Sequence, residues 1–150
     1  MKGFDEFNII PFSKEYQEEA KKLILEGIKE YVGEININFN KDLNNIEEQY
    51  KDGKFLLAIH KEKLIGTGAL IYNGEFGQIV RMSVDKNYRN LGIGKKLLDE
   101  LIEHALKNNT KKIIVETTNN WKNAINFYKS YGFKFLHYKD DNIYFYLDIK

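Results

Sequence analysis

The chain has 150 residues, 43% of them hydrophobic and 30% charged, which fits a single globular domain over residues 1–150 with one core. Its 23 lysines and arginines nearly balance 22 aspartates and glutamates, so we expect neither nucleic acid nor an anionic membrane as a partner. The chain contains no cysteine, which excludes disulfides, a thiolate nucleophile and Cys-bound metal, and no run reaches the roughly 18 apolar residues of a membrane span.

The N-terminal part of the chain predicts a strand and then helices. Acidic side chains occur within residues 1–6, where a signal peptide would have an apolar run, so we expect a cytoplasmic protein. The short apolar segment 7–12 predicts a strand, and Ser13 can cap a helix after it. Residues 33–40 alternate but are rich in asparagine, and residues 43–50 suit a short second helix. The first helix has apolar positions at three-four spacing, namely Ala20, Leu23, Ile24, Gly27, Ile28 and Tyr31.

The middle of the chain predicts three strands that run back and forth. Residues 55–59, 64–72 and 78–84 are rich in β-branched and other apolar side chains. Turns at 61–63 and 73–75 separate these strands, and the second turn contains Asn-Gly, a strong hairpin signal. We therefore expect the three strands to pair as antiparallel neighbours.

After these strands the spacing of apolar residues changes to a helical period. It predicts a helix that ends near Asn108, followed by a buried strand at 112–118. A connection of this length between two strands implies that they pair in parallel, in a right-handed βαβ unit. The helix is expected to turn one apolar face inward, made of Leu97, Leu98, Leu101, Ile102, Ala105 and Leu106.

The C-terminal part predicts another helix and a closing hairpin. The helix runs from about Trp121 to Gly132, a residue suited to the position after a helix end. Segments 135–138 and 143–149 flank a polar turn and predict two paired strands. Together the segments predict an α+β fold, with a mixed, mainly antiparallel central sheet of about seven strands and about four helices.

A glycine-containing turn lies where the third strand meets the long helix. Arg89, Gly92 and Gly94 occur in the pattern R-x-x-G-x-G, and Lys95 and Lys96 follow directly. A helix N-terminus has unpaired backbone N–H groups and the positive end of the helix dipole, so it attracts phosphate. The alternative is a flexible turn without a ligand. A Rossmann site is disfavoured because G-x-G-x-x-G is absent.

Two motifs in sequence order resemble a known family. The stretch IVRMSVDKNYRNLGIGKKLLDEL (79–101), followed by NAINFYKSYGF (123–133), resembles the GNAT superfamily of acyl-CoA-dependent N-acetyltransferases. In that family the R/Q-x-x-G-x-G/A turn holds the pyrophosphate of coenzyme A. The resemblance implies the acetyltransferase fold over nearly the whole chain and acetyl-CoA as co-substrate. The second signature corresponds to Asn123, Ala124, Phe127, Tyr128, Gly132 and Phe133, with the alanine offset by one position.

The resemblance also implies which residues hold the co-substrate. The pantetheine arm is expected along the backbone of Met82, Ser83 and Val84, in the manner of an added strand. Asn123 either contacts the co-substrate or serves only the start of its helix. The pyrophosphate is expected at the turn formed by Arg89, Asn90, Leu91, Gly92, Ile93, Gly94 and Lys95.

For catalysis the resemblance points to Tyr128 as the group that protonates the departing thiolate, although by position alone the side chain suits the core. Many family members have a glutamate where this chain has Gln78, which cannot accept a proton. Glu116 could act as the base instead, directly or through water. Weaker candidates for the base are Glu34, Glu75 and His60.

These observations predict an N-acetyltransferase that moves an acetyl group directly to a primary amine of a small molecule or peptide. Neither cysteine nor G-x-S-x-G is present, which disfavours an acyl-enzyme. A non-catalytic acyl-CoA-binding module is the alternative, because Gln78 replaces the usual carboxylate. The three histidines are scattered and predict no metal site. We expect residues 33–50 to set the acceptor, and aromatic residues within 143–149 suggest a homodimer.

Overall fold

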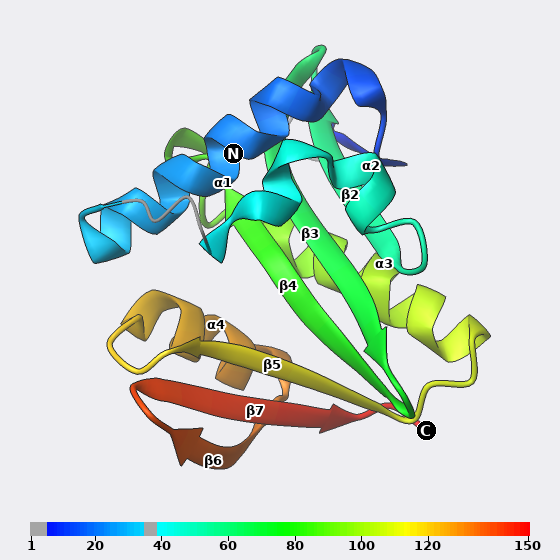
Figure 1. Ribbon diagram of the computed structural model, residues 1–150, viewed down its shortest axis with the longest axis vertical. Coiled ribbons are helices and arrows are strands. Elements are labelled where there is room, and N and C mark those ends of the chain that lie inside the picture. Colours follow the sequence, from blue (N-terminus) through cyan, green and yellow to red (C-terminus); the bar gives the residue numbers. More distant parts are fainter. Residues whose placement is uncertain (1–5, 35–38) are drawn as a thin grey trace.

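Seven strands form one mixed sheet in the computed structural model, which describes residues 6–34 and 39–150. The strand order is β1-β2-β3-β4-β5-β7-β6, and every neighbouring pair is antiparallel except β4 and β5. This is the fold class that the sequence predicts (Figure 1). The strands are β1 (Asn8–Pro11), β2 (Lys54–His60), β3 (Lys63–Asn73), β4 (Phe76–Val84), β5 (Lys112–Thr118), β6 (Lys134–Lys139) and β7 (Asn142–Asp148).

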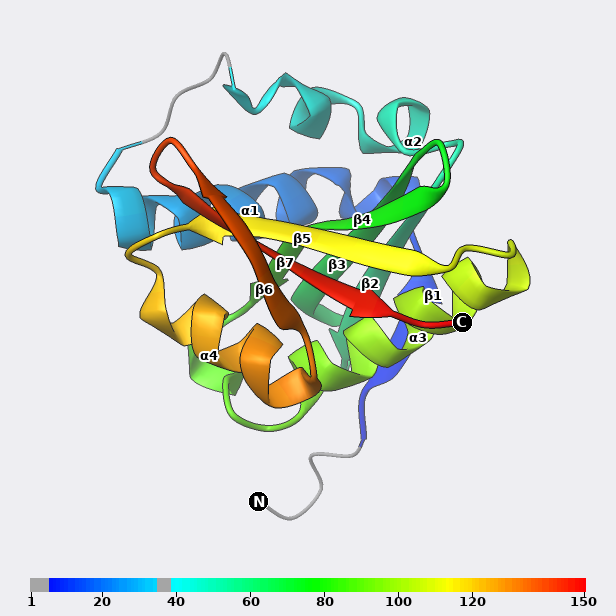
Figure 2. The ribbon, with the colours of Figure 1, turned by 90° about the horizontal axis from the view of Figure 1, so that it is seen from below.

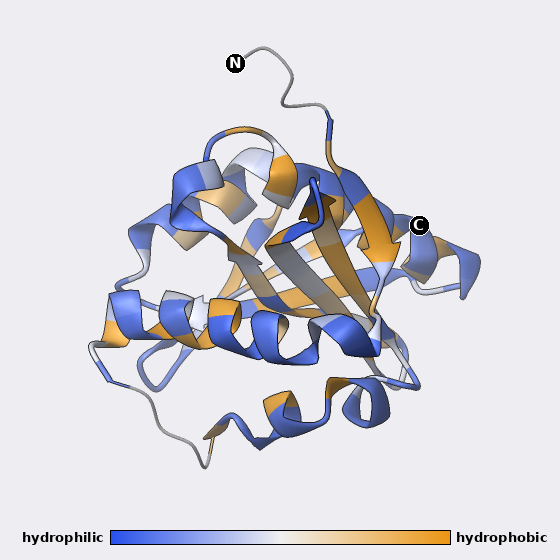
Figure 3. Cartoon of the chain, turned by 90° about the horizontal axis from the view of Figure 1, so that it is seen from above, coloured by the Kyte–Doolittle hydropathy of each residue, from blue (hydrophilic) through white to orange (hydrophobic). Residues whose placement is uncertain are grey.

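Helices cover both faces of the sheet. Figure 2 shows α1 and α2 on one face, and α3 and α4 on the other. Apolar residues follow the strands and the inner sides of the helices, while the outer sides are hydrophilic (Figure 3). The helices are α1 (Gln17–Val32), α2 (Ile46–Gln49), α3 (Ile93–Lys107) and α4 (Lys122–Tyr131), with short 3-10 turns at Lys14–Tyr16, Lys41–Asn44 and Lys86–Tyr88.

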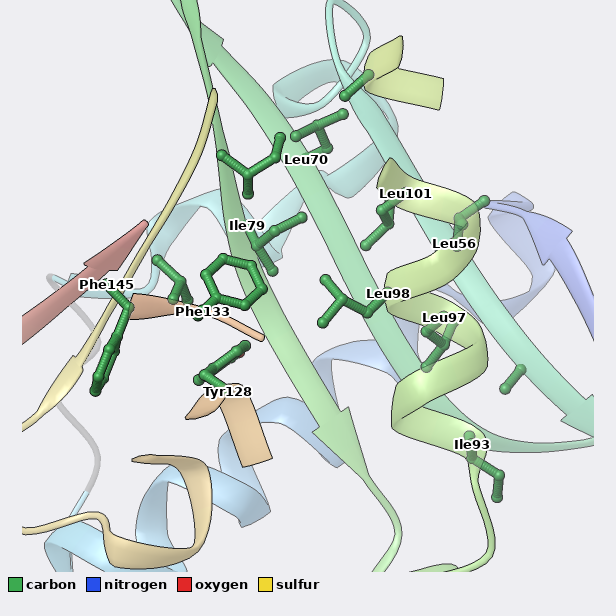
Figure 4. Close-up of a cluster of buried hydrophobic side chains, with 14 of the residues drawn as sticks. Leu56, Leu70, Ile79, Ile93, Leu97, Leu98, Leu101, Tyr128, Phe133 and Phe145 are labelled. Carbon is green, nitrogen blue, oxygen red and sulfur yellow. The ribbon is translucent and has the colours of Figure 1, made fainter. Parts of the chain in front are cut away.

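Each helical layer has its own hydrophobic cluster. Beneath α1 and α2, the cluster includes Ala20, Ile24 and Leu43. On the opposite face, α3 packs its leucines against β2, β3 and β4, and Tyr128 of α4 joins the same cluster (Figure 4). Burial of apolar area at about 25 cal/mol per Å² is the main stabilising contribution of such clusters.

Most of the predicted inward face of α3 is buried. Leu97, Leu98, Leu101 and Ala105 have no exposed surface. Leu106 is 40% exposed, so its predicted place in the core is wrong. It lies at the edge of the helical face and in the last turn of α3, where the period carries it away from the sheet.

The ends of the helices differ in how well the sequence predicts them. The hydroxyl of Ser13 donates to Glu15 at 3.1 Å and caps no helix, and α1 begins only at Gln17 after a 3-10 turn. The predicted cap is therefore wrong. At α4 the prediction is confirmed, since the helix ends before Gly132, whose φ of 124° places it in the region that favours glycine.

The predicted parallel pair opens part-way along its length. β4 and β5 pair from Phe76–Lys112 to Ile79–Val115, and beyond that point both strands continue without pairing to each other. Figure 1 shows the two strands diverging. Near the opening, Arg81 has a φ of 55°, and the register between β3 and β4 shifts, as in a β-bulge. The sheet therefore separates where α3 and α4 begin.

The closing hairpin is present as predicted, but β7 lies between β5 and β6. Phe145 of β7 is fully buried, so the aromatic residues of 143–149 include core residues and offer no free strand edge. Within the closing hairpin, the large apolar side chains that are exposed lie on β6, namely Phe135, Leu136 and Tyr138. Any contact between two copies in this part of the molecule would use β6.

Candidate functional site

A cavity of about 1200 Å³ occupies the opening between β4 and β5. Its walls come from β4, the turn before α3, β5 and α4. Ile24, Gly27, Ile28 and Tyr31 of α1 close it on the other face of the sheet. The cavity thus passes from one helical layer to the other, and part of the apolar face of α1 lines it.

The glycine turn forms one end of this cavity. Gly92 is the N-cap of α3, and its φ of 86° lies in the left-handed region that favours glycine. The backbone N–H groups of Ile93, Gly94 and Lys95 lie in the first turn, where helices leave donors without intrahelical partners. These donors and the helix dipole make the start of α3 a candidate site for an anion.

Arg89 connects this turn to α1. Its guanidinium donates to both carboxylate oxygens of Glu30, at 2.6 and 3.0 Å, and its Nε donates to the Val84 carbonyl at 3.2 Å. The hydrogen bonds from Arg89 lower the pKa of Glu30, so the pair stays ionised. The side chain of Arg89 therefore orders the turn from within the chain.

The structure brings almost all predicted site residues together. Leu91 is the exception, because its side chain packs against the hydrophobic cluster and does not line the cavity. Ile93 is only 1% exposed, so it offers a ligand its backbone alone. The predicted residues that line the cavity are Met82, Ser83, Val84, Arg89, Asn90, Gly92, Ile93, Gly94, Lys95, Glu116, Asn123 and Tyr128.

Tyr128 combines a core position with access to the cavity. It is 6% exposed, and its ring packs edge-on against Phe127 and Phe133 at centroid distances of 5.1 and 5.5 Å. Burial raises its pKa, so the phenol stays protonated at neutral pH. Among the described residues, none accepts a hydrogen bond from its hydroxyl. The hydroxyl proton of Tyr128 is therefore available to a ligand.

Glu116 lies where the large cavity meets a smaller one of about 310 Å³. Its Oε2 accepts a hydrogen bond from Asn142 Nδ2 at 2.5 Å. The pKa of Tyr144 is raised by burial and by a hydrogen bond to Glu116. Within residues 6–34 and 39–150, no lysine, arginine or histidine forms an ion pair with Glu116. Its negative charge is hydrogen-bonded but not neutralised.

The other candidates for a base lie elsewhere. Glu34, Glu75 and His60 line neither cavity. Gln78 lines the small cavity, and its Oε1 accepts from Asn73 Nδ2 at 2.9 Å. Of the predicted carboxylates, Glu116 alone reaches the opening between β4 and β5.

An ion pair that the sequence analysis did not single out forms the wall of the small cavity. Nη2 and Nε of Arg81 donate to the two oxygens of Asp42 at 2.6 and 3.0 Å, and Tyr50 donates to the same carboxylate. Burial alone would raise the pKa of Asp42, but the hydrogen bonds from Arg81 and Tyr50 lower it below the ordinary value. The available signal was an arginine inside the apolar strand IVRMSV.

Two buried polar atoms beside the large cavity have no partner among the described residues, Thr117 Oγ1 and Trp121 Nε1. Leaving a buried donor or acceptor unpaired costs about 1–3 kcal/mol. Trp121 also packs on Tyr31 with ring centroids 4.4 Å apart, which joins the start of α4 to the end of α1. No local pattern in the sequence indicates these unpaired atoms.

Two other features are absent from the described residues. No group of three or more histidine, cysteine, aspartate or glutamate side chains there could hold a metal ion. No helix in the same part of the chain has the length and apolar character needed to cross a membrane.

Comparison with known proteins identifies the family. The profile described as "Acetyltransferase (GNAT) family" matches residues 14–133. The chain belongs to the GNAT acetyltransferase family. A GNAT-family acetyltransferase from Staphylococcus aureus Mu50 has a solved structure that is 34% identical, with a TM-score of 0.88, 96% of this chain covered and 99% of that one. The PaiA N-acetyltransferase of Thermoplasma acidophilum, solved with coenzyme A, has a TM-score of 0.82 over 95% of this chain and 98% of that one. At 20% identity, PaiA supports the GNAT fold alone.

Curated relatives of this GNAT protein are longer. N-acetylaspartate synthetase of Xenopus tropicalis is 37% identical over 98 residues, which are 62% of this chain and 36% of that protein. Human N-acetyltransferase 8B is 28% identical over 109 residues, which are 67% of this chain and 48% of that protein. The GNAT chain thus spans between a third and a half of the length of these relatives.

Proposed function

We propose that this GNAT protein transfers an acetyl group from acetyl-CoA directly to a primary amine of a small molecule or peptide. The observation that carries the proposal is the continuous cavity that joins the candidate anion site at Gly92 to Glu116 and Tyr128. Membership of the GNAT family supports it, as do the acetyltransferase names of the relatives.

The residues of the cavity fit acetyl-CoA. The first-turn N–H groups of α3 would bind the pyrophosphate. Lys95 lines the same end of the cavity, where its ammonium forms an ion pair with Asp99 at 3.1 Å. The backbone of Met82, Ser83 and Val84 borders the cavity beyond the last β4–β5 pair, so its polar groups can bind the pantetheine arm as a strand would. Asn123 lines the same cavity from α4.

Two side chains would move the protons. Glu116 accepts a proton from the acceptor ammonium, directly or through water, and leaves a neutral amine. The nitrogen lone pair attacks the thioester carbonyl carbon, the N–C bond forms and the C–S bond breaks. Tyr128 donates its proton to the departing thiolate, whose basicity is comparable to that of a phenol. The acylated nitrogen loses its second proton to the Tyr128 phenolate, directly or through water, which gives the neutral amide and restores the phenol. The buried, protonated phenol of Tyr128 and its place on the cavity wall support this role.

A non-catalytic acyl-CoA-binding module is the second candidate, favoured by Gln78 at the usual carboxylate position. Thiol release measured across a panel of amines separates the two, and thermal shift reports binding independently. Acetyl-CoA at a hundred times its Kd should stabilise the fold by about 2.7 kcal/mol. Stabilisation with thiol release by an amine supports the enzyme, whereas stabilisation without release by any amine would favour the binding module.

Several finer expectations stay predictions. They are a cytoplasmic location, a homodimer and the control of acceptor choice by residues 33–50. Of that segment, residues 35–38 lie outside the described part of the chain. The remainder supports the expectation about the acceptor, because Asp42 and Tyr50 line the small cavity.

A further inference from the structure

We infer that the small cavity is the acceptor site and that it selects amines without a carboxylate near the reacting nitrogen. This inference rests on the proposed acetyltransferase function. It goes beyond that function because it names the chemical class of the acceptor. The evidence is the arrangement of three charged side chains, Asp42, Arg81 and Glu116, around the cavity.

The two cavities meet at a defined place. Ile79, Val80, Arg81 and Glu116 line both of them. An amine held in the small cavity therefore reaches the large cavity beside Glu116, the group proposed to accept its proton. A volume of about 310 Å³ suits a compact molecule or the end of a longer one.

The guanidinium that could bind a carboxylate is already occupied. Arginine recognises carboxylates through paired N–H groups, and here Asp42 takes that position on Arg81. The remaining nitrogen, Nη1, donates to Asn40 Oδ1 at 3.0 Å. A carboxylate on the acceptor would have to displace Asp42 from Arg81.

This wall is held in place by the bulge of β4. Arg81 has a positive φ of 55°, which non-glycine residues rarely adopt, and the Thr67 hydroxyl donates to its carbonyl at 2.8 Å. The Tyr50 hydroxyl donates to Asp42 Oδ2, the same oxygen that accepts from Arg81 Nε. The ion pair thus connects β4 to the segment before β2 and is anchored at both ends.

The remaining charge of the small cavity is negative. Two carboxylates and one guanidinium line it, so one net negative charge is left, and Glu116 carries it. Asn142 donates a hydrogen bond to Glu116 and does not change this charge. An ammonium is attracted to such a site, and a second carboxylate is repelled.

Amines paired with their parent amino acids test the inference. Tyramine and tyrosine, histamine and histidine, and agmatine and arginine each differ by one carboxylate. Turnover is measured by thiol release, and binding is measured by calorimetry with coenzyme A present. We expect each amine to exceed its amino acid at least ten-fold in kcat/KM and in affinity, equivalent to about 1.4 kcal/mol.

The two proposals can fail separately. Preferential binding of amines without turnover would contradict the acetyltransferase function and leave the selectivity intact. Equal or better use of the amino acids would overturn the inference while confirming an acetyltransferase. Failure of every amine to bind would also overturn it, because the small cavity would then not be an acceptor site.

Charge variants test the origin of the selectivity. Asp42→Asn releases the Arg81 guanidinium and makes the cavity neutral, so the amine preference should fall at least five-fold. The double variant Asp42→Asn with Arg81→Gln removes both charges and leaves Glu116, so the amine preference should persist. Asp148→Asn makes the same charge change at the exposed pair with Lys112, outside both cavities, and should not alter the preference.

These variants also allow for a folding defect. Asp42→Asn leaves a largely buried guanidinium without its carboxylate, which is destabilising, so melting temperatures are recorded for every variant. If Asp42→Asn does not fold, the double variant still tests the inference, because loss of the amine preference in the double variant would overturn it. An unchanged preference in a folded Asp42→Asn protein would overturn it as well.

Discussion

Gly94 is a position where the fold and the binding of the proposed co-substrate favour different side chains. It is the second residue of α3, and its φ is not positive. A Cβ built on it would lie 3.4 Å from Cε1 and Cζ of Phe127 and 3.9 Å from Cγ2 of Val84. These are ordinary contacts, so the folded chain has room for alanine. The methyl group would nevertheless point toward side chains that line the large cavity.

Alanine and valine at this position should have different effects. Replacing glycine by alanine where the backbone permits it stabilises a protein by about 0.4–1 kcal/mol, so Gly94→Ala should raise the Tm by about 1–4 °C. The family pattern allows alanine at this position, so Gly94→Ala should leave the Kd for coenzyme A nearly unchanged, whereas the larger side chain of Gly94→Val should separate the first-turn N–H groups from the pyrophosphate. Loss of one hydrogen bond to a charged group costs about 1.5–3 kcal/mol, which would raise the Kd of Gly94→Val roughly ten-fold to 150-fold.

Calorimetric titration with coenzyme A and a thermal melt of the same preparation measure both quantities. Gly74→Val is the matched control, because Gly74 lies in the β3–β4 turn away from both cavities and has a φ of 64°. Valine there should lower the Tm through backbone strain and leave the Kd unchanged. A folded Gly94→Val protein that binds coenzyme A with wild-type affinity would refute the phosphate assignment.

Four further outcomes are expected. Tyr128→Phe should lower turnover by roughly 10²-fold to 10⁴-fold in thiol-release assays with little change in acetyl-CoA affinity, and wild-type turnover under chemistry-limited conditions would exclude it as the acid. Thr117→Val should raise the free energy of unfolding in urea by about 1 kcal/mol, because the Thr117 hydroxyl lacks a partner among the described residues. Thr67→Val should lower it by a similar amount, because the Thr67 hydroxyl donates to the Arg81 carbonyl. A lower free energy of unfolding for Thr117→Val would contradict this prediction. The pKa of Asp42 is lowered by folding, so its ion pair contributes fully above about pH 4 and is lost as the pH falls through the folded pKa. The unfolding free energies of wild type and Asp42→Asn should therefore converge in acid, and a constant difference would argue against the ion pair. Sedimentation at micromolar concentration should show a species of twice 17.7 kDa, and a purely monomeric protein would remove the homodimer.

Local patterns in the sequence are sufficient to predict most elements. Residues 112–118 form β5 with the predicted bounds, because a run of β-branched residues between polar segments is a local signal. The end of α4 at Gly132 and the turn at Gly92 were equally predictable, since each depends on backbone angles that glycine adopts readily. The spacing of Arg89, Gly92 and Gly94 likewise predicts an anion site at the start of α3, and that site stays a prediction.

Features that depend on distant segments were decided only by the tertiary structure. The sequence contains no signal that β7 lies between β5 and β6, because strand order depends on which edges meet after the chain collapses. The ion pair of Arg81 with Asp42 joins residues 39 positions apart, and the positive φ of Arg81 depends on a register shift between β3 and β4. The charge of the small cavity depends on packing of this kind, as does the lack of a partner for the Thr117 hydroxyl among the described residues. The spacing of apolar residues indicates which face a residue occupies, and not which distant side chain it contacts.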